Sequence, residues 1–351
     1  MISQKQLSLA DIFEDCKDIF ESDKPQFLTL LENHIDLDEI IPFSFYNHYY
    51  AATGRNRKYP LTAMLWALII QRLFSIPTDS LLLVFLHYSR HLREFCGFTK
   101  VPDASKITRF KQDFLSDLQA VFDKLVDITE PICRDIDNNL ASMLLFDTSG
   151  IEAYVTENNP KYANRIIRQL KSYAKSMNFD SSYDPYKVAY ASMPTSASSN
   201  HEVKQQYING HFCYAYKFGI ITNGLGIVRY IYFYNKDYLA LLPDIVVEKK
   251  AKSPDEHKSL ADSKALLPTL KNFKTRRGSK EWDETYKIRV NVEKSINHFK
   301  DSFCIAKRKT TNEKTLHSDL LLAGISQLLT VVVADKINQR QHIRSLKSLI
   351  A

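Results

Sequence analysis

Residues 285–300 read T-Y-K-I-R-V-N-V-E-K-S-I-N-H-F-K, a stretch that contains neither glycine nor proline. Its apolar residues recur at steps of four and then three, at Ile288, Val292, Ile296 and Phe299. Such a recurrence is typical of a helix that buries one face. The stretch therefore predicts a single helix packed against a core.

Four polar side chains of this predicted helix advance by three, four and seven residues, the steps that return a side chain to roughly the same side. They are Tyr286, Arg289, Glu293 and Lys300. A carboxylate beside two cations and a phenol suits a hard metal ion with a phosphate behind it. Glu293 would bind the metal, and Arg289 and Lys300 would hold phosphate oxygens. On spacing alone, the solvated face of an ordinary helix is the simpler interpretation.

The spacing Tyr, two residues, Arg, three, Glu, six, Lys resembles the signature around the last acidic residue of insertion-sequence DDE transposases. The text that follows, C-I-A-K-R-K-T and then L-L-A-G-I-S-Q-L-L-T, is also similar to the C-terminal end of that family. The resemblance implies a ribonuclease-H-like domain in which carboxylates hold Mg²⁺ or Mn²⁺. It implies in-line attack by a metal-activated water at the element's end, followed by transfer of the liberated 3′-hydroxyl to target DNA. Tyr286, Arg289 and Lys300 would position DNA phosphates or Glu293.

An earlier stretch, M-L-L-F-D-T-S-G at residues 143–150, is a short apolar run that ends in Asp147. It predicts a buried strand, a turn at Ser149–Gly150 and a return strand over residues 151–155. An aspartate at the end of a strand is usually a turn residue. By resemblance, Asp147 takes the first acidic position of the DDE family and is a metal ligand. Residues 211–222 and 226–234 then predict a hairpin about N-G-L-G.

The family's second carboxylate should lie on a strand between this hairpin and Glu293, and the sequence of that interval contains no such strand. Asp262, in A-D-S-K-A, is a substitute metal ligand, although it suits a helix N-cap better. Asp255 and Glu256 are weaker options. Two carboxylates supply only about half of the ligand set of two-metal phosphoryl transfer. The catalytic domain is therefore predicted to be incomplete, and a catalytically defective DNA-binding remnant is the alternative function. A metal-dependent nuclease without strand transfer is a third.

Residues 1–140 read as helical almost throughout, with helices expected over 61–74, 80–87, 90–95 and from Pro102–Asp103 onward. Short helices that end in a basic helix are compatible with helix-turn-helix DNA binding, and equally with a bundle that has a solvated basic face. The resemblance implies the N-terminal helical domain that recognises the transposon end. The candidate DNA contacts are Arg55, Arg57, Lys58, Lys106 and Arg109, with Lys111 on the same polar side.

The predicted fold class is α+β: an all-α DNA-binding domain over 1–140 and an incomplete ribonuclease-H-like α/β domain over 141–340, with a C-terminal tail at 341–351. A polar insertion occupies about 157–209 and includes a basic helical piece near Asn164–Lys175 that would reach DNA. Paired transposon ends imply a homodimer on double-stranded DNA, both the element's ends and the target.

The net charge of +7 and the pI near 8.9 favour a polyanionic partner. The five cysteines are widely separated and form no C-x-x-C pair, so neither a zinc site nor a disulfide framework is expected. The N-terminus has no apolar signal region, and the apolar runs 61–70 and 320–333 read as buried helices rather than membrane spans. We expect a bacterial cytoplasmic protein, associated with the nucleoid when bound to DNA.

Overall fold

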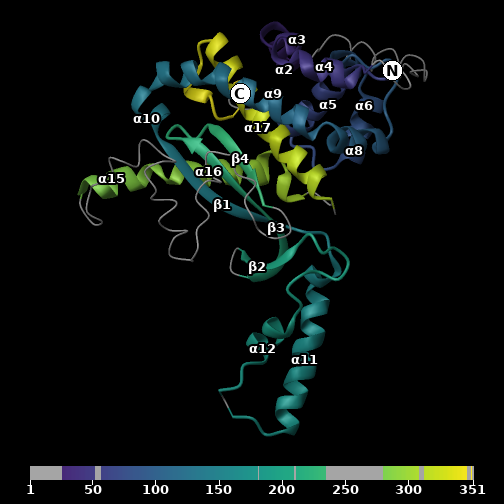
Figure 1. Cartoon of the computed structure of the whole chain (residues 1–351), viewed down its shortest axis with the longest axis vertical. Coiled ribbons are helices and arrows are strands. Elements are labelled where there is room, and N and C mark those ends of the chain that lie inside the picture. The colour runs from purple at the N-terminus through teal and green to yellow at the C-terminus, as the bar shows by residue number, and fades with distance from the viewer. Residues whose placement is uncertain are drawn as a thin grey trace, which may run out of the picture. The chain divides into compact units, whose positions relative to one another are not determined.

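The computed structural model describes residues 26–51, 57–180, 182–208, 211–234, 280–307, 312–345 and 349. They belong to two compact units: unit 1 comprises Met1–Ile132 with Ile325–Ala351, and unit 2 comprises Cys133–Gly324. Helices and a small antiparallel sheet make up the chain, which agrees with the α+β prediction (Figure 1). The predicted functional limits at residues 140 and 340 stay predictions.

The described part of unit 1 is built mostly from short helices. They are α2 (Gln26–His34), α3 (Leu37–Ile40), α4 (Phe43–Tyr49), α5 (Leu61–Leu73), α6 (Asp79–Tyr88), α7 (Arg90–Cys96), α8 (Ala104–Asp113) and α9 (Leu115–Ile136), whose last turn reaches into unit 2. Side-chain caps fix four of the starts, because the oxygens of Asp36, Thr78, Ser89 and Asp103 accept backbone N–H groups of the first turn. The helices that the sequence predicted between residues 61 and 113 are thereby confirmed.

The core of unit 1 surrounds α5, in which every residue except Thr62 is buried. Burial of each Leu or Ile side chain there stabilises the folded state by roughly 1.5–3 kcal/mol. The prediction that Lys111 lies on the polar side of its helix with Lys106 and Arg109 was wrong. Its side chain is fully buried and donates to both carboxylate oxygens of Asp79, at 2.9 and 3.0 Å. Burial of the cation is tolerated because Asp79 neutralises it, and Gln71 also donates to Asp79.

The helix α17 (Glu313–Lys336) is the one helix of the described chain that is long and apolar enough to cross a membrane. In its most apolar window 94% of the residues are buried inside the protein. The prediction that residues 320–333 form a buried helix is therefore confirmed.

The sheet of unit 2 is organised on β3 (His211–Asn223), the longest of its strands. The strand β1 (Leu144–Glu152) pairs with it antiparallel, from Leu144 opposite Asn223 to Glu152 opposite Ala215. The strands β2 (Lys204–Ile208) and β4 (Val228–Phe233) also pair antiparallel with β3.

The predicted turn at Ser149–Gly150 was wrong, because β1 continues without interruption through both residues. The glycine serves a close approach instead of a reversal. A Cβ atom at Gly150 would lie 2.0 Å from Cδ1 of Ile208. Any larger residue would collide with that side chain, so Gly150 lets β2 approach β1.

The predicted hairpin about N-G-L-G is confirmed as β3–β4. Gly226 has a φ of +79°, a conformation that favours glycine, and its N–H donates to the carbonyl oxygen of Asn223 at 2.9 Å. The Asn223 side chain accepts the N–H of Ile227 at 3.0 Å. The turn is thus fixed by its own residues.

Further helices of unit 2 lie before β1, between β1 and β2, and after β4. They are α10 (Asn138–Ser142), the 3₁₀ turn η1 (Thr156–Asn158), α11 (Pro160–Ser176), α12 (Pro185–Ser192), α15 (Lys280–Ile288), α16 (Val290–Asn297), the π-helical turn η3 (His298–Ser302) and the 3₁₀ turn η4 (Ile305–Lys307). The basic helix expected near Asn164–Lys175 is confirmed as part of α11.

The stretch 285–300 is helical as predicted, but it does not form one continuous helix. It is interrupted at Arg289, where the N–H of Arg289 bonds the carbonyl of Tyr286 at 3.0 Å in the tighter i→i+3 pattern. It then widens into the π turn η3. Val292, Ile296 and Phe299 are buried as predicted, whereas Ile288 is only partly buried.

Candidate functional site

One guanidinium joins residues that are far apart in the sequence. Nη2 of Arg289 lies 3.4 Å from Oδ1 of Asp147, and Nη1 donates to Oε1 of Glu293 at 2.9 Å. Nη1 is also 3.3 Å from the hydroxyl oxygen of Tyr286, over whose ring the guanidinium carbon lies at 5.8 Å from the centroid. We call Asp147, Tyr286, Arg289 and Glu293 the acidic cluster.

The interruption at Arg289 explains how one side chain reaches both carboxylates. Arg289 stands at the junction between α15 and α16, with Tyr286 one turn before it and Glu293 one turn after it. Steps of three and four residues along a helix bring side chains together. Asp147 comes from the sheet, since α16 packs on both β1 and β3. The cluster therefore forms where a helix crosses the sheet.

Asp147 lies within its strand and not at the strand's end as predicted. It is the fourth residue of β1, opposite Ile220 of β3, and its Oδ1 accepts the N–H of Thr148 at 2.8 Å. Its side chain is 27% exposed, against 46% for Glu293. A paired strand gives this carboxylate a fixed backbone, and its partial exposure leaves it open to a ligand.

The turn between β3 and β4 holds α16 in place. Asn291 Nδ2 donates to the carbonyl oxygen of Gly224 at 2.8 Å, and Ser295 Oγ donates to that of Gly226. These two residues stand two positions before and two positions after Glu293. Because both ends of this turn of helix are bound to the hairpin, the height of Glu293 above the sheet is set by the N-G-L-G turn.

Lys300 lies apart from the acidic cluster. It belongs to η3 and is about half-buried, and Asp301 and Glu152 are the carboxylates that act on it. Burial lowers the pKa of its ammonium group, and these neighbours partly oppose that effect. Burial also raises the pKa of the Cys213 thiol to about 11, so the thiol stays protonated at neutral pH. Lys300 thus lies near the C-terminal end of β1, where Glu152 is located.

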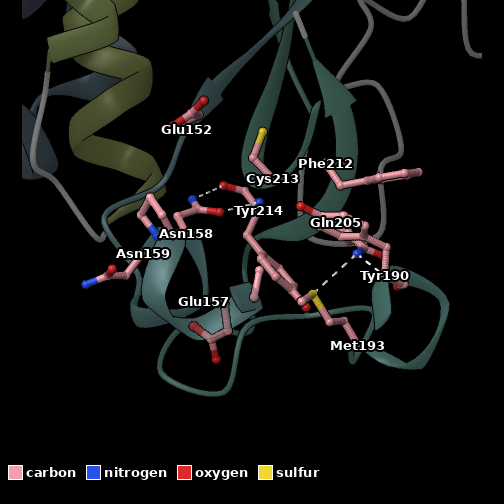
Figure 2. Close-up of a pocket in the computed structure, with 12 residues that line it drawn as sticks. Glu152, Glu157, Asn158, Asn159, Tyr190, Met193, Gln205, Phe212, Cys213 and Tyr214 are labelled. Carbon is pink, nitrogen blue, oxygen red and sulfur yellow. Dashed lines mark hydrogen bonds between the residues drawn. The ribbon is translucent and has the colours of Figure 1, made fainter. Parts of the chain in front are cut away.

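A pocket lies at the C-terminal end of β1, and Figure 2 shows it between β3 and the start of α11. Glu152, Glu157 and Cys213 are among its lining residues, and no residue of the acidic cluster is. Glu157 is buried, and one of its carboxylate oxygens accepts the N–H of Ser198 at 2.7 Å as well as its hydroxyl. We regard this pocket as structural.

The two carboxylates of the acidic cluster are hard oxygen ligands of the kind that Mg²⁺ and Mn²⁺ prefer. Among the residues that the structure describes, no group of three or more His, Cys, Asp or Glu side chains is placed to hold a metal ion. Asp262, Asp255 and Glu256 lie outside the described residues. Metal binding by Asp147, Glu293 and Asp262 therefore stays a prediction.

The candidate DNA contacts of unit 1 are exposed where the structure describes them. Arg57, Lys58, Lys106 and Arg109 are all exposed, and Arg55 lies outside the described residues. Arg57 also has a structural role, because its Nε donates to the carbonyl of Tyr49 at 3.1 Å and its guanidinium lies over that ring. The other three are available to a polyanion.

Sequence reasoning missed Asn291 and Ser295. They share the helix with the motif but point to the opposite side, where the apolar residues pack. A polar residue near the apolar face is the signal that would have indicated them, since the buried Ser295 hydroxyl and the partly buried Asn291 amide need partners.

Residues 15–113 match the family described as Transposase domain (DUF772). This match supports a transposase family for the chain. No curated protein and no solved structure matches. The matched residues end before Asp147, so the acidic cluster rests on the geometry alone.

Proposed function

We propose that this chain is a DNA transposase that cleaves phosphodiester bonds at the ends of a mobile element and joins those ends to target DNA. The bridging of Asp147 and Glu293 by Arg289 carries the proposal. It brings the first and last acidic residues of the resemblance to one place on the sheet. The transposase-type domain over residues 15–113 supports the same class of function.

In this proposal Asp147 and Glu293 hold a divalent ion, Mg²⁺ or Mn²⁺. When bound, such an ion polarises a phosphate oxygen and promotes ionisation of a water molecule. Two carboxylates that face one site repel each other, and a guanidinium between them relieves that repulsion. Arg289 therefore holds the two carboxylates at one site.

The remaining motif residues act on DNA or on one another. Arg289 is partly exposed, so a guanidinium released from Asp147 would reach a phosphate and bind it through two N–H groups. Tyr286 is about half exposed and orients Arg289 through its hydroxyl oxygen and its ring. Lys300 is proposed to bind DNA phosphate near the C-terminal end of β1.

A second function is DNA binding without catalysis, as in a defective copy of a transposase. The observation that favours it is the absence of a third carboxylate near Asp147 and Glu293 among residues 26–234 and 280–345, as far as these are described. Two ligands give a weak metal site, because two-metal catalysis uses a larger set. For both functions the proposed partner is double-stranded DNA, the proposed assembly is a homodimer and the proposed location is the cytoplasm.

The test uses labelled duplexes taken from the DNA that flanks the coding sequence, incubated with the full chain and Mg²⁺ or Mn²⁺. Transposition predicts a nick that exposes a 3′-hydroxyl, and pre-cleaved duplexes should then join to a supercoiled plasmid. Cleavage without joining would indicate a nuclease. Binding without cleavage would leave the DNA-binding function, and absence of both would overturn the proposal.

A further inference from the structure

A row of cations runs along one side of α11. Its members are Lys161, Arg165, Arg168, Lys171 and Lys175, all exposed. Steps of four, three, three and four residues keep them within an arc of about 120° at 3.6 residues per turn. The row is about 21 Å long at 1.5 Å per residue. We call these five residues the α11 basic row.

The α11 basic row is not balanced by acidic residues. The 17-residue helix contains no Asp or Glu. Within the described part of the chain, none of the five cations forms an ion pair with a carboxylate, although Lys171 donates to the hydroxyl of Tyr186 at 2.9 Å. An ordinary solvated helix face mixes charges of both signs. A face with one sign only attracts a polyanion.

The opposite side of α11 is partly covered by protein. It packs against α12, where Ile167 of α11 and Ala189 of α12 are buried, and Figure 1 shows the two helices side by side. An amphipathic helix that lies on a membrane must insert its apolar face into lipid. Ile167 is buried on that face, whereas Tyr173 near the end of the helix stays exposed, so the one-signed charge of the α11 basic row is the feature that favours a polyanion.

The base of α11 is fixed to the sheet. The Asn158 amide donates to the carbonyl oxygens of Ala153 and Tyr214 at 2.8 and 2.7 Å, and its oxygen accepts the N–H of Tyr214 at 2.7 Å, as Figure 2 shows in part. Asn159 then caps the helix, and Pro160 is its first residue. Because Ala153 directly follows β1, α11 starts from the strand that carries Asp147.

We propose that the α11 basic row binds the phosphate backbone of duplex DNA, as a contact surface separate from the acidic cluster and from the candidate contacts of unit 1. This inference rests on the proposed function, which supplies DNA as the partner. A duplex carries one phosphate charge per about 1.7 Å of its axis, so a row about 21 Å long follows roughly six base pairs. Contacts of this kind position DNA and do not depend on its sequence.

The experiment compares binding of two duplexes of equal length, one from the flanking DNA and one of unrelated sequence, across a series of salt concentrations. The variant Lys161→Gln, Arg165→Gln, Arg168→Gln, Lys175→Gln removes four charges and keeps the Lys171–Tyr186 contact. Loss of four phosphate contacts lowers the slope of log K against log salt by about 3–4. We expect weaker binding to both duplexes, with Kd raised at least about tenfold at low salt.

Two control proteins make the result specific. The variant Lys100→Gln, Arg134→Gln, Lys280→Gln, Lys314→Gln removes four exposed cations elsewhere and should keep nearly the whole slope. The variant Arg165→Lys, Arg168→Lys keeps the charge and should bind almost as the wild type does. Circular dichroism and the thermal midpoint of each variant check that it folds.

Three results would overturn the inference. If the four-glutamine α11 variant binds both duplexes with wild-type affinity and slope, the basic row does not contact DNA, and the proposed function stands. If it loses binding to vesicles that contain phosphatidylserine but keeps DNA binding, the partner is an anionic membrane. If the wild type binds no duplex, the proposed function falls together with this inference.

Discussion

Asn291 donates a hydrogen bond of 2.8 Å to the backbone carbonyl of Gly224, and so ties the helix of Glu293 to the β3–β4 turn. Ser295 makes the equivalent bond to Gly226 one turn later. The distance between Glu293 and Asp147 therefore depends on a hairpin that neither residue belongs to. Positions that contact no substrate should then affect catalysis.

Replacing both anchors, Asn291→Ala with Ser295→Ala, should slow cleavage and leave DNA affinity unchanged. Each lost hydrogen bond costs about 0.5–1.5 kcal/mol of stability, and a small shift of Glu293 costs on the order of 10²-fold in rate. Single-turnover cleavage and duplex binding, measured on the same protein, check the separation of the two effects. Equal losses in binding and cleavage would instead indicate general unfolding.

Replacing Arg289 should separate metal binding from catalysis. Arg289→Gln removes the cation between two carboxylates, which then repel each other more and attract a divalent ion more strongly. We expect Mn²⁺ to bind at least as tightly as in the wild type, while cleavage falls about 10²-fold because a phosphate contact is lost. Electron paramagnetic resonance of Mn²⁺ measures the first quantity. Weaker Mn²⁺ binding in Arg289→Gln would contradict the assigned role.

His317 should make the protein less stable in mild acid. It stacks on Phe233 at 5.2 Å between ring centroids, and burial lowers its pKa from 6.5 to about 4. Between these two values the unfolded chain binds more protons, so the free energy of unfolding falls as the pH drops from about 6.5 to about 4. The full difference is on the order of 3 kcal/mol.

The check is urea denaturation at pH 7 and pH 4.5, for the wild type and for His317→Phe. The variant should lose less stability than the wild type over this interval, since phenylalanine does not titrate. An equal loss in both proteins would assign the acid sensitivity to other groups.

The buried pair of Lys111 and Asp79 should be needed for the stability of unit 1. Asp79→Ala leaves a fully buried ammonium group without its carboxylate, and breaking such a pair costs about 3–5 kcal/mol. The exposed pair of Arg90 and Glu94 is the matched control, and Glu94→Ala should change the thermal midpoint little. Similar midpoints for the two variants would show that the buried pair contributes nothing special.

Much of the local structure could be predicted because it depends on neighbouring residues. The capping oxygens of Thr78 and Asp103 act on backbone groups three positions away, and the N-G-L-G turn is closed by Asn223 and Gly226. The buried face of α16 follows from helical periodicity. A shared catalytic role for Asp147 and Glu293 was expected from family resemblance and stays a prediction, although both carboxylates contact the Arg289 guanidinium.

What could not be predicted depends on residues distant in sequence. Gly150 reads as a turn until Ile208 is known to pack against it, and Lys111 reads as solvated until Asp79 is placed beside it. The interruption at Arg289 comes directly before α16, the helix that packs on the sheet. Helix propensities alone do not predict such a break. The position of Lys300 near Glu152 depends on the π turn, whose wider spacing the motif does not reveal.

The pairing of Asp147 and Glu293 in one catalytic site is tested most directly by the cleavage rate of the flanking-DNA duplex in Mn²⁺, measured for four proteins. They are the wild type, Asp147→Asn, Glu293→Gln and the double variant, all with confirmed duplex binding. Residues that act as one unit are strongly non-additive. We predict that each single variant loses at least about 10³-fold and that the double variant loses no more than either. Cleavage by either single variant at the wild-type rate would contradict the shared site.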